Sequence, residues 1–245
     1  MRCAVISDLH SNLEAFNAVL HHIDAAGVDT TICLGDIVGY NADPNGCIEL
    51  VRERQIGSIL GNHESWVCGF TSLDYLSSTV RQATLWTREQ LSEENLTFLK
   101  GLPRKLPFDD GALAVHGWVN DTDRYILTPG DALANFELLS RDPLPYGLCF
   151  FGHTHLRKCY SLQDSTVLSH RDEALRLGED SRYLVNPGSV GQPRDYDRRA
   201  SFALYDTDIP EVRFFRVDYD IETCCRKIID AGLPEGLAER LKVGR

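Results

Sequence analysis

Several apolar runs in this sequence end in side chains that can bind a metal ion. Asp8 and His10 follow "AVIS", Asp36 follows "TICLG", and Asn62 and His63 follow "SILG". Three more histidines come directly after later apolar runs: His116, His153 and His155. Imidazole nitrogens mixed with carboxylate and amide oxygens suit Mn²⁺, Fe²⁺, Zn²⁺ or Co²⁺ better than Mg²⁺, which prefers oxygen ligands.

Each of these positions alone has an ordinary structural explanation. A Gly-Asp pair after a strand is a common turn, and a single histidine is more often hydrogen-bonded than bound to a metal. The set is different, because ligands of α/β proteins bind where the carboxyl ends of strands meet. Five of the eight histidines fall at such ends, which favours one site with convergent ligands. We interpret His21, His22 and His170 as surface or helix residues.

The first part of the chain alternates between strand and helix patterns. Ser11 and Glu14 have the spacing of a capping box, so we expect the first helix to start there and to end at Gly27. A second helix is expected from Pro44 to Gln55. The flanking strands are predicted at 2–7, 30–36 and 56–62. Residues 72–99 again have a helical composition, and Pro103 and Pro107 then break the chain.

The later part of the chain consists mostly of strand patterns. We predict strands at 112–117, 148–155, 166–169, 182–189, 201–206 and 212–218, with helices at 221–231 and in the last dozen residues. Helices that alternate with strands early, followed by many strands, indicate an α/β fold with two packed sheets and outer helices. Without a repeat or a linker, residues 1–245 are expected to form a single domain. The segments 201–206 and 212–218 alternate like half-exposed strands, and such a strand at an edge could pair with a second chain.

The composition narrows the classes of function. The net charge of −11 argues against general nucleic-acid binding, although a local cationic site can still attract a small anion. No apolar stretch approaches the roughly 20 residues that span a bilayer, and an aspartate is reached at position 8. We therefore expect a cytoplasmic protein with no membrane contact. The eight cysteines contain no Cys-x-x-Cys pair, so we predict free thiols.

Taken in order, these motifs resemble the full signature of the calcineurin-like metallophosphoesterases. The segments that carry the resemblance are Asp8-x-His10, Gly35-Asp36, Gly61-Asn62-His63-Glu64, His116 and Gly152-His153-x-His155. The loop "NPGSVGQPR", 186–194, is similar to one in the small single-domain bacterial and archaeal phosphodiesterase branch. The resemblance implies a four-layer αββα sandwich, in which two packed mixed β-sheets are flanked by helices.

The same resemblance implies two divalent metal ions, Mn²⁺ first and Fe²⁺, Zn²⁺, Co²⁺ or Ni²⁺ as alternatives. The first ion would take Asp8, His10 and His155. The second would take Asn62, His116 and His153, and Asp36 would bridge the two. A hydroxide held between the metals would attack phosphorus. His63 would not be a ligand but would face the substrate as a catalytic acid or hydrogen-bond donor, and Asp36 or Glu64 could orient it.

We expect a phosphodiesterase that acts on a small or nucleotide-like phosphoester. A phosphomonoesterase with the same site is the close alternative, and a non-catalytic metal-binding scaffold is the alternative from another class. The segment "GDIVGYNADP" carries Gly39 and Tyr40 where the superfamily's protein phosphatases and diadenosine tetraphosphatases carry a Gly-Asp-x-Val-Asp-Arg-Gly pattern. The missing arginine disfavours both of these activities. Candidate substrate-binding residues are Arg194, Tyr40 and Trp118, although aromatic residues near a site can also simply pack under loops.

Overall fold

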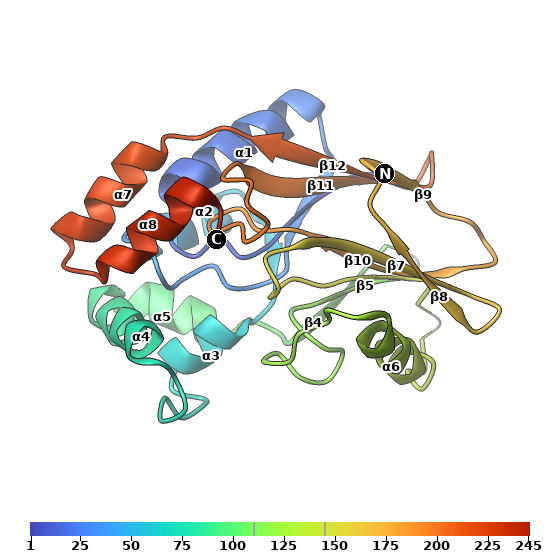
Figure 1. Ribbon diagram of the computed structural model, residues 1–245, viewed down its shortest axis with the longest axis horizontal. Coiled ribbons are helices and arrows are strands. Elements are labelled where there is room, and N and C mark those ends of the chain that lie inside the picture. Colours follow the sequence, from blue (N-terminus) through green and yellow to red (C-terminus); the bar gives the residue numbers. More distant parts are fainter. Residues whose placement is uncertain (110, 145) are drawn as a thin grey trace.

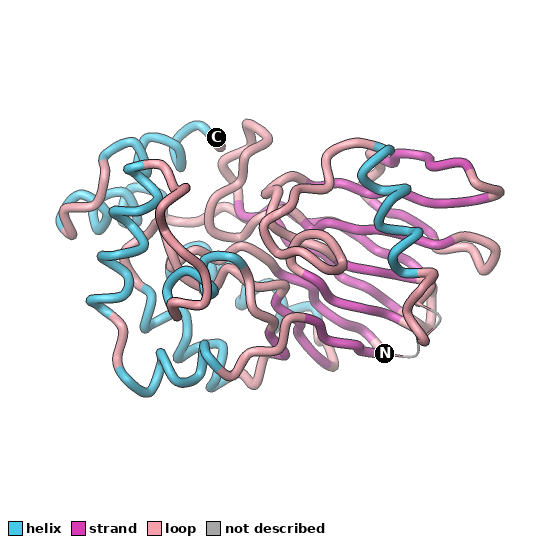
Figure 2. The backbone as a smooth tube through the Cα atoms, turned by 90° about the horizontal axis from the view of Figure 1, so that it is seen from below, coloured by secondary structure: helices cyan, strands magenta, loops and turns pink. Residues whose placement is uncertain are grey.

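Two six-stranded mixed sheets packed face to face form the centre of the computed structural model, which describes residues 1–109, 111–144 and 146–245 (Figures 1 and 2). The first sheet has the order β3 (Gly57–Ser58), β2 (Thr30–Cys33), β1 (Arg2–Ile6), β11 (Ala200–Asp206), β12 (Glu211–Val217), β9 (Ala174–Arg176). The second has the order β4 (Lys105–Phe108), β5 (Ala112–Val115), β6 (Leu148–Phe150), β10 (Arg182–Pro187), β7 (Arg157–Gln163), β8 (Thr166–His170).

Strand β1 shows how the sequence builds these layers. It is buried on both sides, and its side chains alternate between two cores. Cys3 and Val5 pack toward the second sheet, together with Phe150 from β6. Ala4 and Ile6 pack on the opposite side, against the outer helices. A strand covered on both faces requires an almost continuous apolar run, which "CAVI" supplies.

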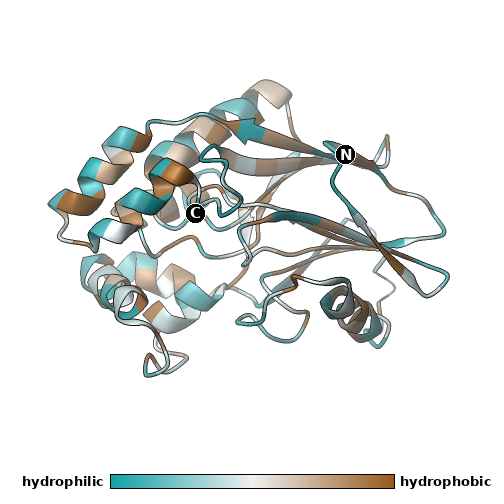
Figure 3. Ribbon diagram, in the orientation of Figure 1, coloured by the Kyte–Doolittle hydropathy of each residue, from teal (hydrophilic) through white to brown (hydrophobic). Residues whose placement is uncertain are grey.

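The helices complete the outer layers. Both α1 (Leu13–Ala26) and α2 (Pro44–Glu53) cover the first sheet, and α6 (Pro129–Leu139) covers the second. The others gather at one end of the molecule (Figure 1): α3 (Asn62–Val67), α4 (Ser78–Gln90), α5 (Glu93–Lys100), α7 (Ile221–Asp230) and α8 (Glu235–Val243). Hydrophobic and hydrophilic residues alternate along α7 (Figure 3), as expected of a helix with one face against the protein. The four-layer αββα architecture is confirmed.

One local expectation, the cap of the first helix, was wrong. The first helix is capped by Asn12, whose Oδ1 accepts the backbone N–H of Ala15 at 3.0 Å. Ser11 lies in the left-handed region, with φ 56°, and its hydroxyl instead accepts the N–H of Gly39. The two late strands are not at an edge, because β11 lies between β1 and β12, and β12 is covered by β9.

Helix α6 was not predicted. Its start carries a clear signal, since the Thr128 hydroxyl accepts the N–H of Asp131 while the Asp131 carboxylate accepts the N–H of Thr128. The region 72–99 also divides, into α4 and α5, with a loop before α4 that becomes important for the site.

All eight cysteines are free, and seven are buried. Within the described residues no helix is both long and apolar enough to cross a lipid bilayer.

Asn12→Ala tests the assigned cap. Besides capping α1, the Asn12 side chain donates a hydrogen bond to the carbonyl of Gly191 at 2.9 Å and is fully buried. We expect a loss of about 1–3 kcal/mol in unfolding free energy, because the cap is lost and a buried carbonyl is left without its partner. Urea denaturation followed by circular dichroism measures it. The matched control is Asn17→Ala, an exposed position in the same helix, and an equal effect of the two substitutions would contradict the assignment.

Candidate metal centre

The metal-ligand candidates lie just beyond the carboxyl ends of parallel strands, in loops or, for Asn62, at the first residue of α3. β1, β2 and β3 run parallel to one another, as do β5, β6 and β10. Asp8, Asp36 and Asn62 follow the first set, and His116 and His153 follow strands of the second. Five of the candidates adopt left-handed backbone conformations, with φ between 47° and 66°: Asp8, His10, Asp36, His153 and His155. Such strain in non-glycine residues costs on the order of 1–3 kcal/mol each and is typical of functional sites.

His10 and His155 present unshared lone pairs to each other. The Nδ1–H groups donate to backbone carbonyls, His10 to Val38 at 3.2 Å and His155 to Gln192 at 2.5 Å. Both Nε2 atoms are therefore unprotonated, and they lie 3.0 Å apart. Burial holds the pKa of each ring well below its usual value, so a proton does not relieve the contact. A metal cation between the two nitrogens would relieve the repulsion. Imidazoles oriented by backbone carbonyls in this way are typical metal ligands.

Two buried carboxylates complete this first group. Asp8 Oδ1 lies 3.4 Å from His155 Nε2, and Asp36 Oδ2 lies 3.7 Å from His10 Nε2. Ligand atoms of the four residues all fall within 4.8 Å of one another. Burial, aided by the neighbouring Asp36 charge, raises the pKa of Asp8 to about 7. Two carboxylates this close are stable as anions only with positive charge between them.

Asp36 also belongs to a second group, with His116 and His153. His116 Nε2 lies 3.3 Å from Asp36 Oδ2 and 2.8 Å from Asn62 Oδ1, while its Nδ1 is bound to the carbonyl of Leu34. Although burial opposes it, the Asp36 carboxylate raises the pKa of His116 to about 10. The position between these three atoms therefore attracts a cation, whether a proton or a metal ion.

The ring of His153 is held by the loop that follows β5. Its Nε2 bonds to the carbonyl of Asp123 at 3.0 Å, which leaves Nδ1 as the lone-pair atom. Tyr125 stacks on the ring, with centroids 4.2 Å apart. Burial lowers the pKa of His153 to about 3, so the ring is neutral, as a metal ligand must be. The structure thus brings together all seven candidate ligands, and their chemistry fits two cations that share Asp36.

His63 lies beside this cluster without joining either group. Its backbone N–H donates to Asp36 Oδ1 at 2.9 Å, and its ring packs against Tyr40 and His10, with centroids 4.5 and 4.6 Å away. Burial lowers the pKa of His63 to about 4, and its Nδ1 has no hydrogen-bond partner among the described residues. Gly39 makes the ring position possible, since a Cβ there would collide with Nδ1, and its φ of 98° suits glycine.

Glu64 has a role that sequence reasoning missed. Its carboxylate is fully buried and accepts three backbone N–H groups, from Asp36 at 2.8 Å, Gly61 at 2.9 Å and Val38 at 3.1 Å. It therefore fixes the shared Asp36 and the start of α3 in one geometry. Asp36, not Glu64, contacts the His63 backbone. The sequence signal was present, because a glutamate three residues after Gly61 matches the second half of a capping box.

A cavity of about 180 Å³ opens over the two groups. Arg194 and Tyr40, both predicted to bind substrate, line it. The Arg194 guanidinium is held by Gln192 Oε1 at 2.9 Å, and within the described chain no carboxylate approaches it within 4.0 Å, so its charge is free to meet an anion. Trp66 also lines the cavity, and the residues that sequence reasoning missed on this wall are Tyr75, Leu76, Asp123 and Tyr125.

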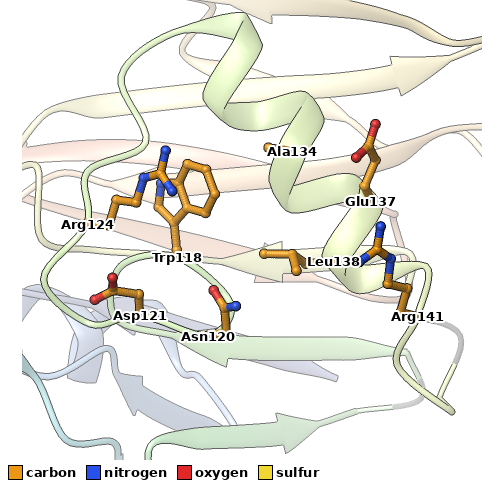
Figure 4. A pocket seen from close by; sticks show the side chains of 8 residues that line it. All are labelled: Trp118, Asn120, Asp121, Arg124, Ala134, Glu137, Leu138 and Arg141. Carbon is orange, nitrogen blue, oxygen red and sulfur yellow. The ribbon is translucent and has the colours of Figure 1, made fainter.

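Trp118 does not line this cavity. It is 8% exposed and lies at one end of a different pocket, beside helix α6, with the Arg124 guanidinium 3.4 Å from its ring centroid (Figure 4). Its indole N–H donates to the carbonyl of Tyr125 at 2.9 Å. The predicted contact between Trp118 and substrate is therefore wrong. Trp118 is close to His116 in the chain, but its side chain turns into the core against α6. From there it supports the loop that carries Tyr125.

Glu64→Gln tests the second layer around the metals. One carboxamide cannot accept from all three backbone donors, because its NH₂ group must face an N–H. We expect the unfolding free energy to fall by about 1–3 kcal/mol and metal affinity to fall roughly 10–100-fold. Melting curves and metal content after dialysis against graded chelator measure both. Glu53→Gln, an exposed glutamate, is the control, and wild-type metal retention by Glu64→Gln would contradict this role.

Comparisons with known proteins agree with this geometry. The calcineurin-like phosphoesterase superfamily domain matches residues 1–209. An uncharacterized protein of Methanocaldococcus jannaschii, MJ0912, is 42% identical over 99% of this chain and 98% of its own. A metallophosphoesterase structure from Sphaerobacter thermophilus superposes with a TM-score of 0.85 at 39% identity, over 100% of this chain and 99% of the other. The hypothetical protein PH1004 from Pyrococcus horikoshii shares the fold, with a TM-score of 0.80 at 22% identity, covering 100% and 98%. The chain therefore belongs to the calcineurin-like phosphoesterase superfamily and is a metal-dependent phosphoester hydrolase.

Proposed function

We propose that this protein is a dinuclear phosphodiesterase that acts on small, nucleotide-like phosphoesters. The observation that carries the proposal is the pair of ligand groups that share Asp36 beneath one cavity. Asp8, His10 and His155 would hold one ion. Asn62, His116 and His153 would hold the other, at the positions where lone pairs converge. Mn²⁺ suits this mixture of nitrogen and oxygen donors, with Fe²⁺, Zn²⁺, Co²⁺ and Ni²⁺ as alternatives.

The bound ions would supply an activated water and neutralise charge on the phosphoryl oxygens. The protein's own part is to fix the geometry. Asp36 is held from both sides, by Glu64 on its backbone and by His63 on its carboxylate. Asn62 contributes a neutral oxygen, which keeps the site's net charge positive enough for a phosphate anion.

His63 and Arg194 act on the substrate itself. His63 is neutral, lines the cavity and does not belong to either ligand group. We assign it to the leaving-group side, where a ring N–H stabilises the departing oxygen. Arg194 lies over the Tyr40 ring at 5.8 Å. Its guanidinium, oriented by Gln192, can donate two parallel hydrogen bonds to non-bridging phosphate oxygens.

The wall of the cavity favours a diester over a monoester. Arg194 is the one lysine or arginine among the described residues that line it, and Asp123 adds a carboxylate to the same wall. A monoanionic diester is repelled less by Asp123 than a dianionic monoester would be. Tyr75 and Tyr125 are 59% and 43% exposed at this wall, and such aromatic faces can hold the second ester group or a nucleobase by stacking.

Hydrolysis of bis-p-nitrophenyl phosphate beside p-nitrophenyl phosphate tests the reaction class. After the protein is stripped and reloaded with Mn²⁺, we expect a higher kcat/KM for the diester, because it carries one negative charge fewer into a cavity that contains Asp123. Asp36→Asn is the blank, since it removes the shared carboxylate. Faster cleavage of the monoester would instead identify a phosphomonoesterase with the same metal centre.

His63→Ala tests the leaving-group assignment. We expect both metal ions to be retained, and turnover of an alkyl ester to fall by about 10²–10⁴-fold. The loss should be much smaller for p-nitrophenyl esters, whose leaving group needs little stabilisation. The control is His22→Ala, an exposed histidine in α1. Loss of metal from His63→Ala, measured by atomic emission, would show that His63 is a ligand.

A further inference from the structure

A second hollow, of about 670 Å³, lies on the far side of the segments that wall the metal cavity. It is lined by β7 and β8, by the loop 195–199 and by Arg216 on β12, and is called here the β7–β8 groove. Figure 1 shows these strands in the two packed layers, β12 in one and β7 with β8 in the other. Its volume falls within the range of about 300–1,000 Å³ that is usual for small-molecule sites.

Cationic side chains outnumber acidic ones in the β7–β8 groove, five to three, although the whole chain carries a net charge of −11. Two of the cations are neutralised, Arg199 by Asp197 at 2.7 Å and Arg216 by Asp195. The remaining three have no carboxylate within 4.0 Å in the part of the chain that the structure describes: Arg157, Lys158 and Arg171. This local excess is the reverse of the protein's average and favours an anionic ligand.

The protein holds two of these cations in place without neutralising them. Lys158 Nζ donates to the carbonyl of Leu127 at 2.9 Å. One Arg157 nitrogen donates to the carbonyl of Arg171 at 3.0 Å, and its guanidinium lies 5.3 Å from the centroid of the Phe214 ring. Each keeps further N–H donors for a ligand. An orientation fixed in advance reduces the entropy lost on binding.

The groove and the metal cavity share their walls. His155 lines the cavity and the next residue, Leu156, lines the groove. In the same way, Arg194 lines the cavity and Asp195 lines the groove. In a third segment, Tyr125 lines the cavity and Leu127 lines the groove. A molecule in one hollow is therefore separated from the other by little more than the width of these backbone segments.

From these contacts we propose that the β7–β8 groove binds the phosphate group of a small organophosphate, separately from the metal centre. Arg157, Lys158 and Arg171 would donate charge-assisted hydrogen bonds to its oxygens. Two sources share this chemistry. The phosphate is either a second phosphate group of the substrate or the phosphate group of a free phosphorylated molecule. The first of these sources rests on the proposed function.

Titration calorimetry with phenylphosphonate tests the site itself. This probe carries a phosphoryl dianion on a carbon atom, so the enzyme cannot hydrolyse it. We expect the Mn²⁺-loaded wild type to bind two equivalents, one in the metal cavity and one in the groove. In Lys158→Met/Arg171→Gln, binding of one equivalent should weaken by roughly tenfold or more, since charge-assisted hydrogen bonds are lost.

Arg104→Gln, an exposed arginine outside the groove, is the matched control and should bind like the wild type. Arg171→Gln alone, at an exposed position, provides a second variant if the double substitution lowers the melting temperature. Binding that both groove variants leave unchanged, in the number of equivalents and in affinity, would overturn the proposal.

A pair of substrates separates the two sources. Thymidine 5′-(p-nitrophenyl phosphate) and its 3′-phosphorylated form differ only in the second phosphate. A wild-type preference for the phosphorylated form that is lost in the groove variant places the substrate's second phosphate in the groove. No preference, together with two-site binding, identifies a free organophosphate as the ligand. Rates on bis-p-nitrophenyl phosphate report the metal centre independently, so a failure of the proposed function is distinguishable from a failure of this site.

Discussion

Mutual repulsion among buried ligand atoms is the constraint on which the rest of this structure depends. Asp8 and Asp36 are buried side by side, and His10 and His155 face each other with lone pairs 3.0 Å apart. Burial of such a set is unfavourable unless cations lie between the donors. The fold must therefore hold the donors in place against their own repulsion. Left-handed backbone at five of the ligand residues and backbone carbonyls behind the imidazoles are the means of doing so.

This constraint explains why so much of the surrounding structure consists of hydrogen bonds to the main chain. Glu64 accepts three N–H groups around Asp36, and Asn186 donates to the carbonyl of Gly152, next to the two histidines that follow β6. Ser189 donates to the carbonyl of Asp8. Main-chain atoms in short loops between packed strands move less than side chains, so a network anchored on them suits a metal site, whose ligands must be held to within about 0.5 Å.

The candidate ligand positions were predictable from sequence because each is a polar residue near the end of an apolar strand, whereas their division between two ions came from the resemblance to the family. The same local reasoning failed where placement depends on distant packing. Tyr75 and Asp123 reach the cavity through a contact between two loops, in which the Tyr75 hydroxyl donates to Asp123 at 3.3 Å. No spacing pattern in the chain indicates this pair. Trp118 shows the opposite error, since closeness in sequence to His116 did not bring its side chain into the cavity.

Metal chemistry and substrate choice are therefore built from different parts of the chain. The ligands sit on strand ends fixed by the two central sheets, so their geometry follows from the fold. The cavity wall comes from the loops before α4 and after β5, and Arg194 comes from the loop before β11. The loop after β5 contacts the candidate ligands at His153, through the Asp123 carbonyl and the Tyr125 ring, whereas the loop before β11 also holds His155 through the Gln192 carbonyl. Changes in the wall can alter which ester is accepted while the cluster beneath remains the same. The ligand motif alone thus identifies the reaction but not its substrate, and the charges and aromatic faces of the wall carry that information.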